Sequence, residues 1–193
     1  MLISSERLIH TPVMSLQTGG QLAHTKKPLI DPRNLMIIAY ELEGPALDDH
    51  PSFLMVTDVR ELSHLGLIVD SSDEFVGLDD VIKIPEVYDF GFELFNKTVR
   101  DVSGAKLGKV IGYAVEPGSF MIKQLNVRRP LLKSLTDTEL IIDRTQVTEV
   151  NDTEIIIKND DHQPAPVKRV AKSFTNPFRS GAPQPEAINR RES

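Results

Sequence analysis

Short apolar runs separated by turn residues make up most of the chain, and the same order of runs occurs twice. Two apolar runs rich in β-branched residues, at 106–115 and 120–127, flank the turn "EPGS", in which Pro117 and Gly118 favour a type II turn. The earlier turn "DPRN" has no glycine and favours a type I turn. The pattern therefore predicts a β-hairpin near 22–42 and another near 106–127.

A repeat with an offset of 85 residues relates the two hairpins and the segments that follow them. This offset aligns six pairs of identical residues at turn or apolar positions: Leu22 with Leu107, Pro32 with Pro117, Met36 with Met121, Ile37 with Ile122, Pro45 with Pro130 and Leu47 with Leu132. Further strands are predicted at 53–59 and 66–70, and again at 139–145 and 154–158. The same offset places Asp58 and Asp143 at matching positions, where each is expected to cap a short turn.

Many short strands with frequent turns, and no long helical periodicity, indicate an all-β protein. We expect two tandem small antiparallel β-barrels, the first in 1–72 and the second in 92–160. The segment 73–91 mixes acidic and apolar residues, which favours a connector that packs on a barrel. The proline-rich, basic stretch 161–193 is expected to be a disordered tail.

The second copy resembles the PRC-barrel domain family, a β-barrel found in the H subunit of photosynthetic reaction centres and in the C-terminal part of a ribosome maturation factor. The stretch "KTVRDVSGAKLGKVIGYAVEP" carries the resemblance, through Val99, Asp101, Gly104, Leu107, Gly108, Lys109 and Val110. The first copy departs from this pattern, because Ser15 replaces the acid and Ala23 replaces the glycine. The resemblance implies two PRC-like barrels, the first of them divergent, and a protein that docks onto larger assemblies.

Composition and charge narrow the function classes. The chain has no cysteine and a net charge of −6, with the excess of Lys and Arg confined to the tail beyond Asp160. An acidic body does not favour direct nucleic-acid binding. The longest apolar run, 35–40, is strand-sized, so we expect neither a signal peptide nor a membrane span, and a cytoplasmic location.

Residues that carry catalysis or bind metals show no recognisable grouping. The five histidines are scattered along the chain, so no catalytic residue, metal or cofactor is expected, and the protein is expected not to be an enzyme. The acids between Asp70 and Glu74 are compatible with calcium or with a solvated loop. The loop is favoured, because the glycine and the distal glutamate of a calcium loop are absent.

Two segments have the composition of binding surfaces. One is the loop after the second hairpin, where basic residues are concentrated beside leucines: Arg128, Arg129, Leu131, Leu132 and Lys133. The other is in the tail, where helical spacing places apolar residues on one face, and the candidate anchors are Val167, Val170, Phe174 and Phe178. Each segment has a plainer interpretation, as a barrel end in the first case and a solvated tail in the second.

The sequence therefore favours a non-enzymatic binding or adaptor protein that docks onto a larger protein assembly. Two alternatives stay open: a ribosome-assembly factor acting on the small subunit, which the resemblance implies, and association of the basic tail with an anionic membrane surface. The sequence does not identify the protein partner, and it leaves open whether the chain forms a homodimer.

Overall fold

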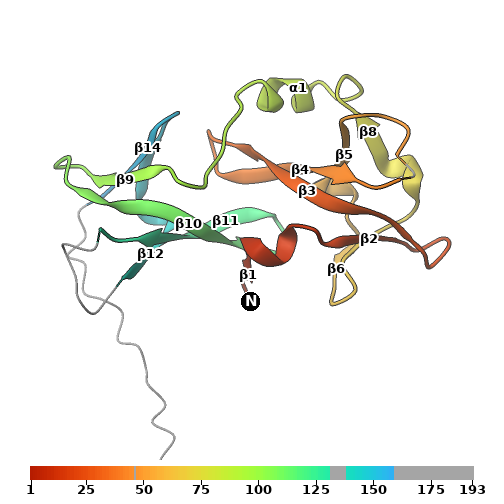
Figure 1. Ribbon diagram of the computed structural model, residues 1–193, viewed down its shortest axis with the longest axis horizontal. Helices are drawn as coiled ribbons and strands as arrows, with labels where there is room; N and C mark the ends of the chain where they lie inside the picture. Colours follow the sequence, from red (N-terminus) through yellow and green to blue (C-terminus); the bar gives the residue numbers. More distant parts are fainter. Residues whose placement is uncertain (46, 131–137, 159–193) are drawn as a thin grey trace, which may run out of the picture. The chain divides into compact units, whose positions relative to one another are not determined.

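The computed structural model describes residues 1–45, 47–130 and 138–158 (Figure 1). Within these ranges the protein is all-β, as predicted, apart from one α-helix and four short 3-10 turns. The strands form one hydrogen-bonded network of 14 strands that curls rather than lying flat. The tail and the predicted loop residues Leu131, Leu132 and Lys133 lie outside the described residues.

The first half of the network is a meander with a parallel return. Strands β2, β3, β4 and β5 pair antiparallel in chain order, and β7 then runs parallel to β2 and antiparallel to the short β6. The bounds are β2 Pro12–Ser15, β3 Gln21–Asp31, β4 Met36–Glu43, β5 Ser52–Met55, β6 Glu61–Leu62 and β7 Leu67–Val69.

The second half has the same order of strand pairings. Strands β9, β10, β11 and β12 pair antiparallel in chain order, and β14 returns parallel to β9 and antiparallel to β13. Its bounds are β9 Thr98–Asp101, β10 Lys106–Glu116, β11 Met121–Arg128, β12 Glu139–Asp143, β13 Val147–Val150 and β14 Glu154–Ile157. The register also recurs, since Thr25 pairs with Leu42 and Val110, 85 residues on, pairs with Val127.

The predicted match between Asp58 and Asp143 is wrong. In the first half, Ala39 pairs with Met55. Its counterpart 85 residues later, Gln124, pairs with Asp143, which lies 88 residues after Met55. The loop before β12 is longer, so Met55 is the counterpart of Asp143. Asp143 does cap a turn, as expected: its Oδ1 accepts the Thr145 N–H at 2.9 Å and Gln146 Oε1 accepts the Asp143 N–H at 2.9 Å.

The predicted type II turn at 116–119 is also wrong. Type II requires a positive φ at Gly118, but the left-handed residue is Phe120, with φ of 53°. The first hairpin has the same geometry at Leu35, also with φ of 53°. Both side chains are buried in the core, and their burial stabilises a backbone conformation that is unfavourable for residues other than glycine.

The tips of the two hairpins bond to each other. The Ile37 N–H donates to the Phe120 carbonyl at 3.1 Å, and the Ile122 N–H donates to the Leu35 carbonyl at 3.0 Å. Ile122 is the counterpart of Ile37, and Phe120 is the counterpart of Leu35, each 85 residues later, so the two bonds are equivalent. The hairpins thus meet in a reciprocal pair, which we call the hairpin junction.

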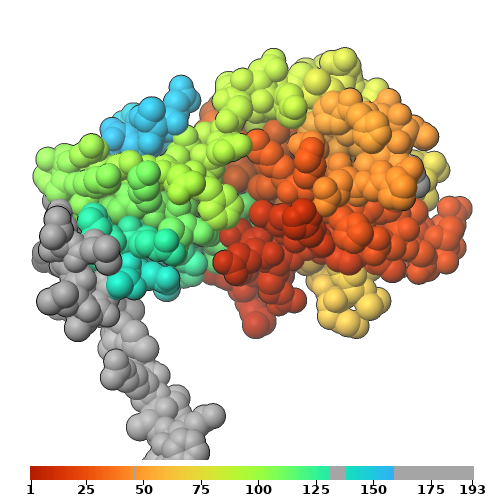
Figure 2. Space-filling model, in the orientation of Figure 1, coloured from red at the N-terminus to blue at the C-terminus, as the bar shows by residue number. Residues whose placement is uncertain are grey.

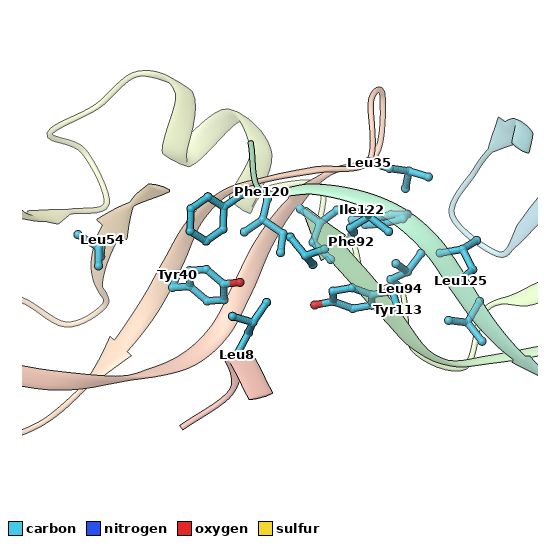
Figure 3. Packing of buried hydrophobic residues seen from close by; sticks show 14 of the residues in the cluster. Leu8, Leu35, Tyr40, Leu54, Phe92, Leu94, Tyr113, Phe120, Ile122 and Leu125 are labelled. Carbon is cyan, nitrogen blue, oxygen red and sulfur yellow. The ribbon is translucent and has the colours of Figure 1, made fainter. Parts of the chain in front are cut away.

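A shared hydrophobic core surrounds the hairpin junction. One buried cluster contains residues of both halves, including Leu8, Tyr40, Leu94, Tyr113 and Phe120. Figure 3 shows Phe120 beside Tyr40, and their ring centroids lie 6.3 Å apart in an edge-to-face arrangement. The described residues accordingly belong to one compact unit.

Segments that precede each half pack against long strands. The N-terminal strand β1 (Ile3–Ser4) pairs with β10, and the following turn η1 (Ser5–Leu8) contacts the same strand. The connector contains turn η3 (Ser72–Glu74), strand β8 (Phe75–Gly77) and helix α1 (Lys83–Tyr88). As predicted, the connector packs on the body: β8 pairs with β5, and α1 contacts β3.

Candidate interaction surface

The end of the connector and the first residues after it carry a run of aromatic residues. Four of the eight positions in "YDFGFELF" are aromatic, namely Tyr88, Phe90, Phe92 and Phe95, and we call these four side chains the connector surface. Figure 2 shows the yellow-green atoms of the connector lying against the red and orange atoms of the first half.

Helix α1 and Gly91 determine which aromatic side chains face solvent. Ile84 and Val87 of α1 are fully buried in a second apolar cluster that includes Phe53. The helix ends at Tyr88, and Gly91, with φ of 54°, turns the chain with its N–H bonded to the Tyr88 carbonyl at 3.0 Å. After this turn Phe92 points inward at 8% exposure.

The other three aromatic side chains of the connector surface remain accessible. Tyr88, Phe90 and Phe95 are 40%, 46% and 36% exposed, which is unusual for rings of this size in one short segment. Each ring is nevertheless supported. Tyr88 meets Phe53 edge-on at 5.8 Å, the Arg33 guanidinium lies 5.6 Å from the centroid of Phe90, and Phe95 lies 5.7 Å from Tyr113.

Two pockets adjoin the connector surface, and both have Lys27, Pro28 and Phe92 in their walls. The first, of about 230 Å³, is also lined by Tyr88 and Phe53. The second, of about 300 Å³, lies between β3 and the segment 92–95, and its further apolar lining is Ile9, Ile30, Leu94, Phe95 and Tyr113. Apolar pockets beside supported, accessible rings are typical of sites that receive apolar side chains.

Charged groups at the rim of the pockets are paired. Lys27 Nζ donates to Glu93 Oε1 at 2.8 Å, and this bond lowers the pKa of Glu93. Lys26 Nζ donates to Glu41 Oε1 at 2.6 Å, and the pKa of Lys26 is raised by that bond. Lys26 therefore remains charged at neutral pH, and the two ion pairs form a polar rim around apolar walls.

A buried lysine holds the base of the connector surface. Lys97 is 8% exposed, its Nζ lies 4.4 Å from the Phe92 ring centroid, and it donates to the Asp152 carbonyl at 2.5 Å. Burial lowers its pKa, against the opposing effect of Asp152 and Glu93. The lysine thus links the connector to the turn before β14.

The predicted loop residues lie elsewhere. Arg128 ends β11 opposite Glu139 and is exposed, while the Arg129 N–H donates to the Thr138 carbonyl at 2.8 Å. Neither residue lines the two pockets described above. Leu131, Leu132 and Lys133, and the tail residues Val167, Val170, Phe174 and Phe178, lie outside the described residues.

Sequence reasoning missed the connector surface, although the density of aromatic residues in 88–95 was a usable signal. The acids between Asp70 and Glu74, the calcium alternative, are partly engaged: Arg60 Nε donates to Asp70 Oδ1 at 3.0 Å. The described residues contain no group of three or more His, Asp or Glu side chains that would hold a metal ion. Across 1–45, 47–130 and 138–158, no helix has the length and apolarity needed to cross a membrane.

Comparison with known proteins adds no family. No protein-family model matches the chain, and no curated protein matches it.

Proposed function

We propose that this protein is a non-enzymatic binding module that docks onto a larger protein assembly through the connector surface. The observation that carries the proposal is three accessible rings in one short segment, Tyr88, Phe90 and Phe95, of which Tyr88 lines one apolar pocket and Phe95 lines the other. Aromatic side chains with fixed orientations lose little conformational entropy on binding, so they are favoured anchors in protein interfaces. The partner that fits is a protein segment with exposed aliphatic or aromatic side chains.

We also propose that the two halves are copies of one PRC-like barrel unit. The support is the repeated register, which recurs in every main strand pair, together with the residues of the second half that match the family pattern. Asp101, the acid of that pattern, has a clear role in the second half. Its Oδ1 accepts the N–H groups of Ser103 and Ala105, both at 2.9 Å. Ser15, its counterpart, organises the first turn more weakly, with Oγ accepting the Thr18 N–H at 3.2 Å.

Site-specific photo-crosslinking in the cells that naturally contain the protein tests the docking proposal. A benzophenone side chain is introduced at Phe90 or Phe95, and for comparison at Leu16 or Val102, which are each 60% exposed but lie outside the connector. We expect one and the same partner to be captured from 90 and 95 and not from 16 or 102. Equal capture from all four positions, or none from 90 and 95, would refute the proposal.

A matched pair of substitutions then measures the contribution of the rings. Phe90→Ser should weaken binding of the captured partner by about tenfold or more, as expected for a central aromatic anchor. Leu16→Ser removes a comparable exposed apolar side chain and should leave the affinity unchanged. If the captured partner belongs to the small ribosomal subunit, the ribosome-assembly alternative becomes the favoured function.

A further inference from the structure

The two halves differ at one sheet edge, although their strand pairings otherwise correspond. In the first half, β5 pairs with β4 on one side and with β8 on the other. Its counterpart β12 pairs with β11, and in the described part of the chain nothing pairs with its other edge. The strand register shows that Ile141 is the counterpart of Phe53. Phe53 lies opposite Glu41, and Ile141 lies opposite Asn126, which is the residue 85 positions after Glu41.

Backbone geometry shows which groups the β12 edge presents. The Arg129 N–H donates to the Thr138 carbonyl, so residues 138, 140 and 142 direct their backbone groups toward β11. Glu139 and Ile141 therefore direct their N–H and C=O groups away from the sheet. In the first half the same position, Phe53, is paired with Val76 of β8. The β12 edge is thus a strand-pairing site that β8 fills in the other half.

Side-chain exposure differs in the same way. Phe53 is 0% exposed, because β8 and α1 cover it, whereas Ile141 is 63% exposed. Glu139 and Asp143, two residues to either side of Ile141 on the same face, are also exposed. An incoming strand therefore meets an apolar position flanked by two carboxylates.

We propose that the β12 edge binds an extended segment of a partner protein, which adds as an antiparallel strand. Charge selects the segment: a small apolar residue opposite Ile141, with Lys or Arg two positions before and after it, opposite Asp143 and Glu139. A second copy of this chain is a poor occupant, because antiparallel self-pairing about Ile141 would place Glu139 against Asp143 in both directions. This site is separate from the connector surface and does not depend on the function proposed for it.

A peptide derived from β8 provides the probe. In the chain, Phe75–Gly77 are flanked by Glu74 and Leu78, and replacing both flanking residues with lysine gives the peptide KFVGK, with capped ends. Its valine is expected to lie opposite Ile141. Titration into the isotope-labelled full chain, followed by NMR, should shift the amide signals of Glu139 and Ile141 at millimolar peptide. The peptide EFVGE should bind about tenfold more weakly, because like charges then face each other.

Two variants of the protein act as controls. Ile141→Pro removes an N–H that points away from β11, a position where an edge strand tolerates proline, and it should abolish binding without loss of signal dispersion. Ile141→Lys keeps the backbone N–H groups and repels the basic peptide, so it should also abolish binding. This variant tests the proposal if the proline variant fails to fold. The proposal is overturned if KFVGK shifts no β12 amide, if EFVGE binds equally well, or if binding survives both variants.

Discussion

At the scale of single residues, the core contains a polar group that the packing does not satisfy. Tyr40 is 1% exposed, and its hydroxyl has no hydrogen-bond partner among the described residues. Figure 3 shows the hydroxyls of Tyr40 and Tyr113 directed toward one another at the centre of the shared core. Burial raises the pKa of both phenols, so each stays protonated across the working range of pH.

Tyr40→Phe should therefore stabilise the protein. The substitution removes a buried hydroxyl without leaving a partner unpaired, and the expected gain in free energy of unfolding is about 1 kcal/mol. Urea denaturation of the variant and of the wild type measures this change in the free energy of unfolding, and Tyr113→Phe is measured as the companion variant. A loss of stability on Tyr40→Phe would contradict the prediction and indicate that an ordered water or Tyr113 bonds this hydroxyl.

At the scale of elements, close strand contacts explain one glycine of the second hairpin. A Cβ added at Gly108 in β10 would lie 2.1 Å from the Arg128 carbonyl oxygen and 2.7 Å from Val127 Cγ1 in β11. The first half has Ala23 at the corresponding position, and Ala23 instead packs against Gly44, where an added Cβ would meet the Ala23 Cα at 3.3 Å. The glycine at this contact thus lies in β10 in the second half and directly after β4 in the first.

Gly108→Ala should consequently destabilise the second hairpin by about 3 kcal/mol, the upper range for an overpacked site. Gly118→Ala, in the turn of the same hairpin, is the matched control, because no atom lies within 4 Å of the added Cβ. Thermal unfolding of both variants is the measurement. Equal stability of the two variants would show that β10 and β11 separate readily to admit a side chain.

Apolar runs and turn residues were sufficient to predict the hairpins β3–β4 and β10–β11 and the positions of β5, β7, β12 and β14, because these runs are bounded by turn residues in the sequence. The short strands β1, β2, β6, β8, β9 and β13 were not predicted. The same patterns did not predict helix α1, since six residues with Pro85 inside carry too little periodicity, and its support comes from tertiary burial of Ile84 and Val87. The left-handed Phe120 was missed for the same reason: its conformation depends on the core contacts of its ring. The connector surface depends on the fold of 88–95 against β3, which no local pattern specifies.

At the scale of the whole molecule, the sequence repeat predicts two barrels, while the core of the described unit is shared. One buried cluster runs from Val13 and Leu67 of the first half to Val99 and Ile155 of the second. Each half also packs a segment against the other: β1, which precedes the first half, pairs with β10 of the second, and helix α1, which precedes the second half, contacts β3 of the first. Exposing the core of one half would therefore expose part of the other.

We expect the two halves to unfold in a single cooperative transition. Native-state hydrogen exchange should give the amides of Val13 and Val99 the same free energy of opening, equal to the global value from denaturant unfolding. Calorimetry should show one peak, with equal calorimetric and van't Hoff enthalpies. Two separated transitions would instead mean that each half is stable on its own.

The hairpin junction has a consequence for how the sequence can change over evolutionary time. Turns of β-hairpins normally tolerate insertions, because they lie at the surface and bond to little else. Here the residues that end the two turns, Leu35 and Phe120, are buried and each accepts a bond from the opposite hairpin. Lengthening either turn would displace a carbonyl that the other hairpin needs. The two turns are therefore expected to keep their lengths together, while the loops elsewhere drift.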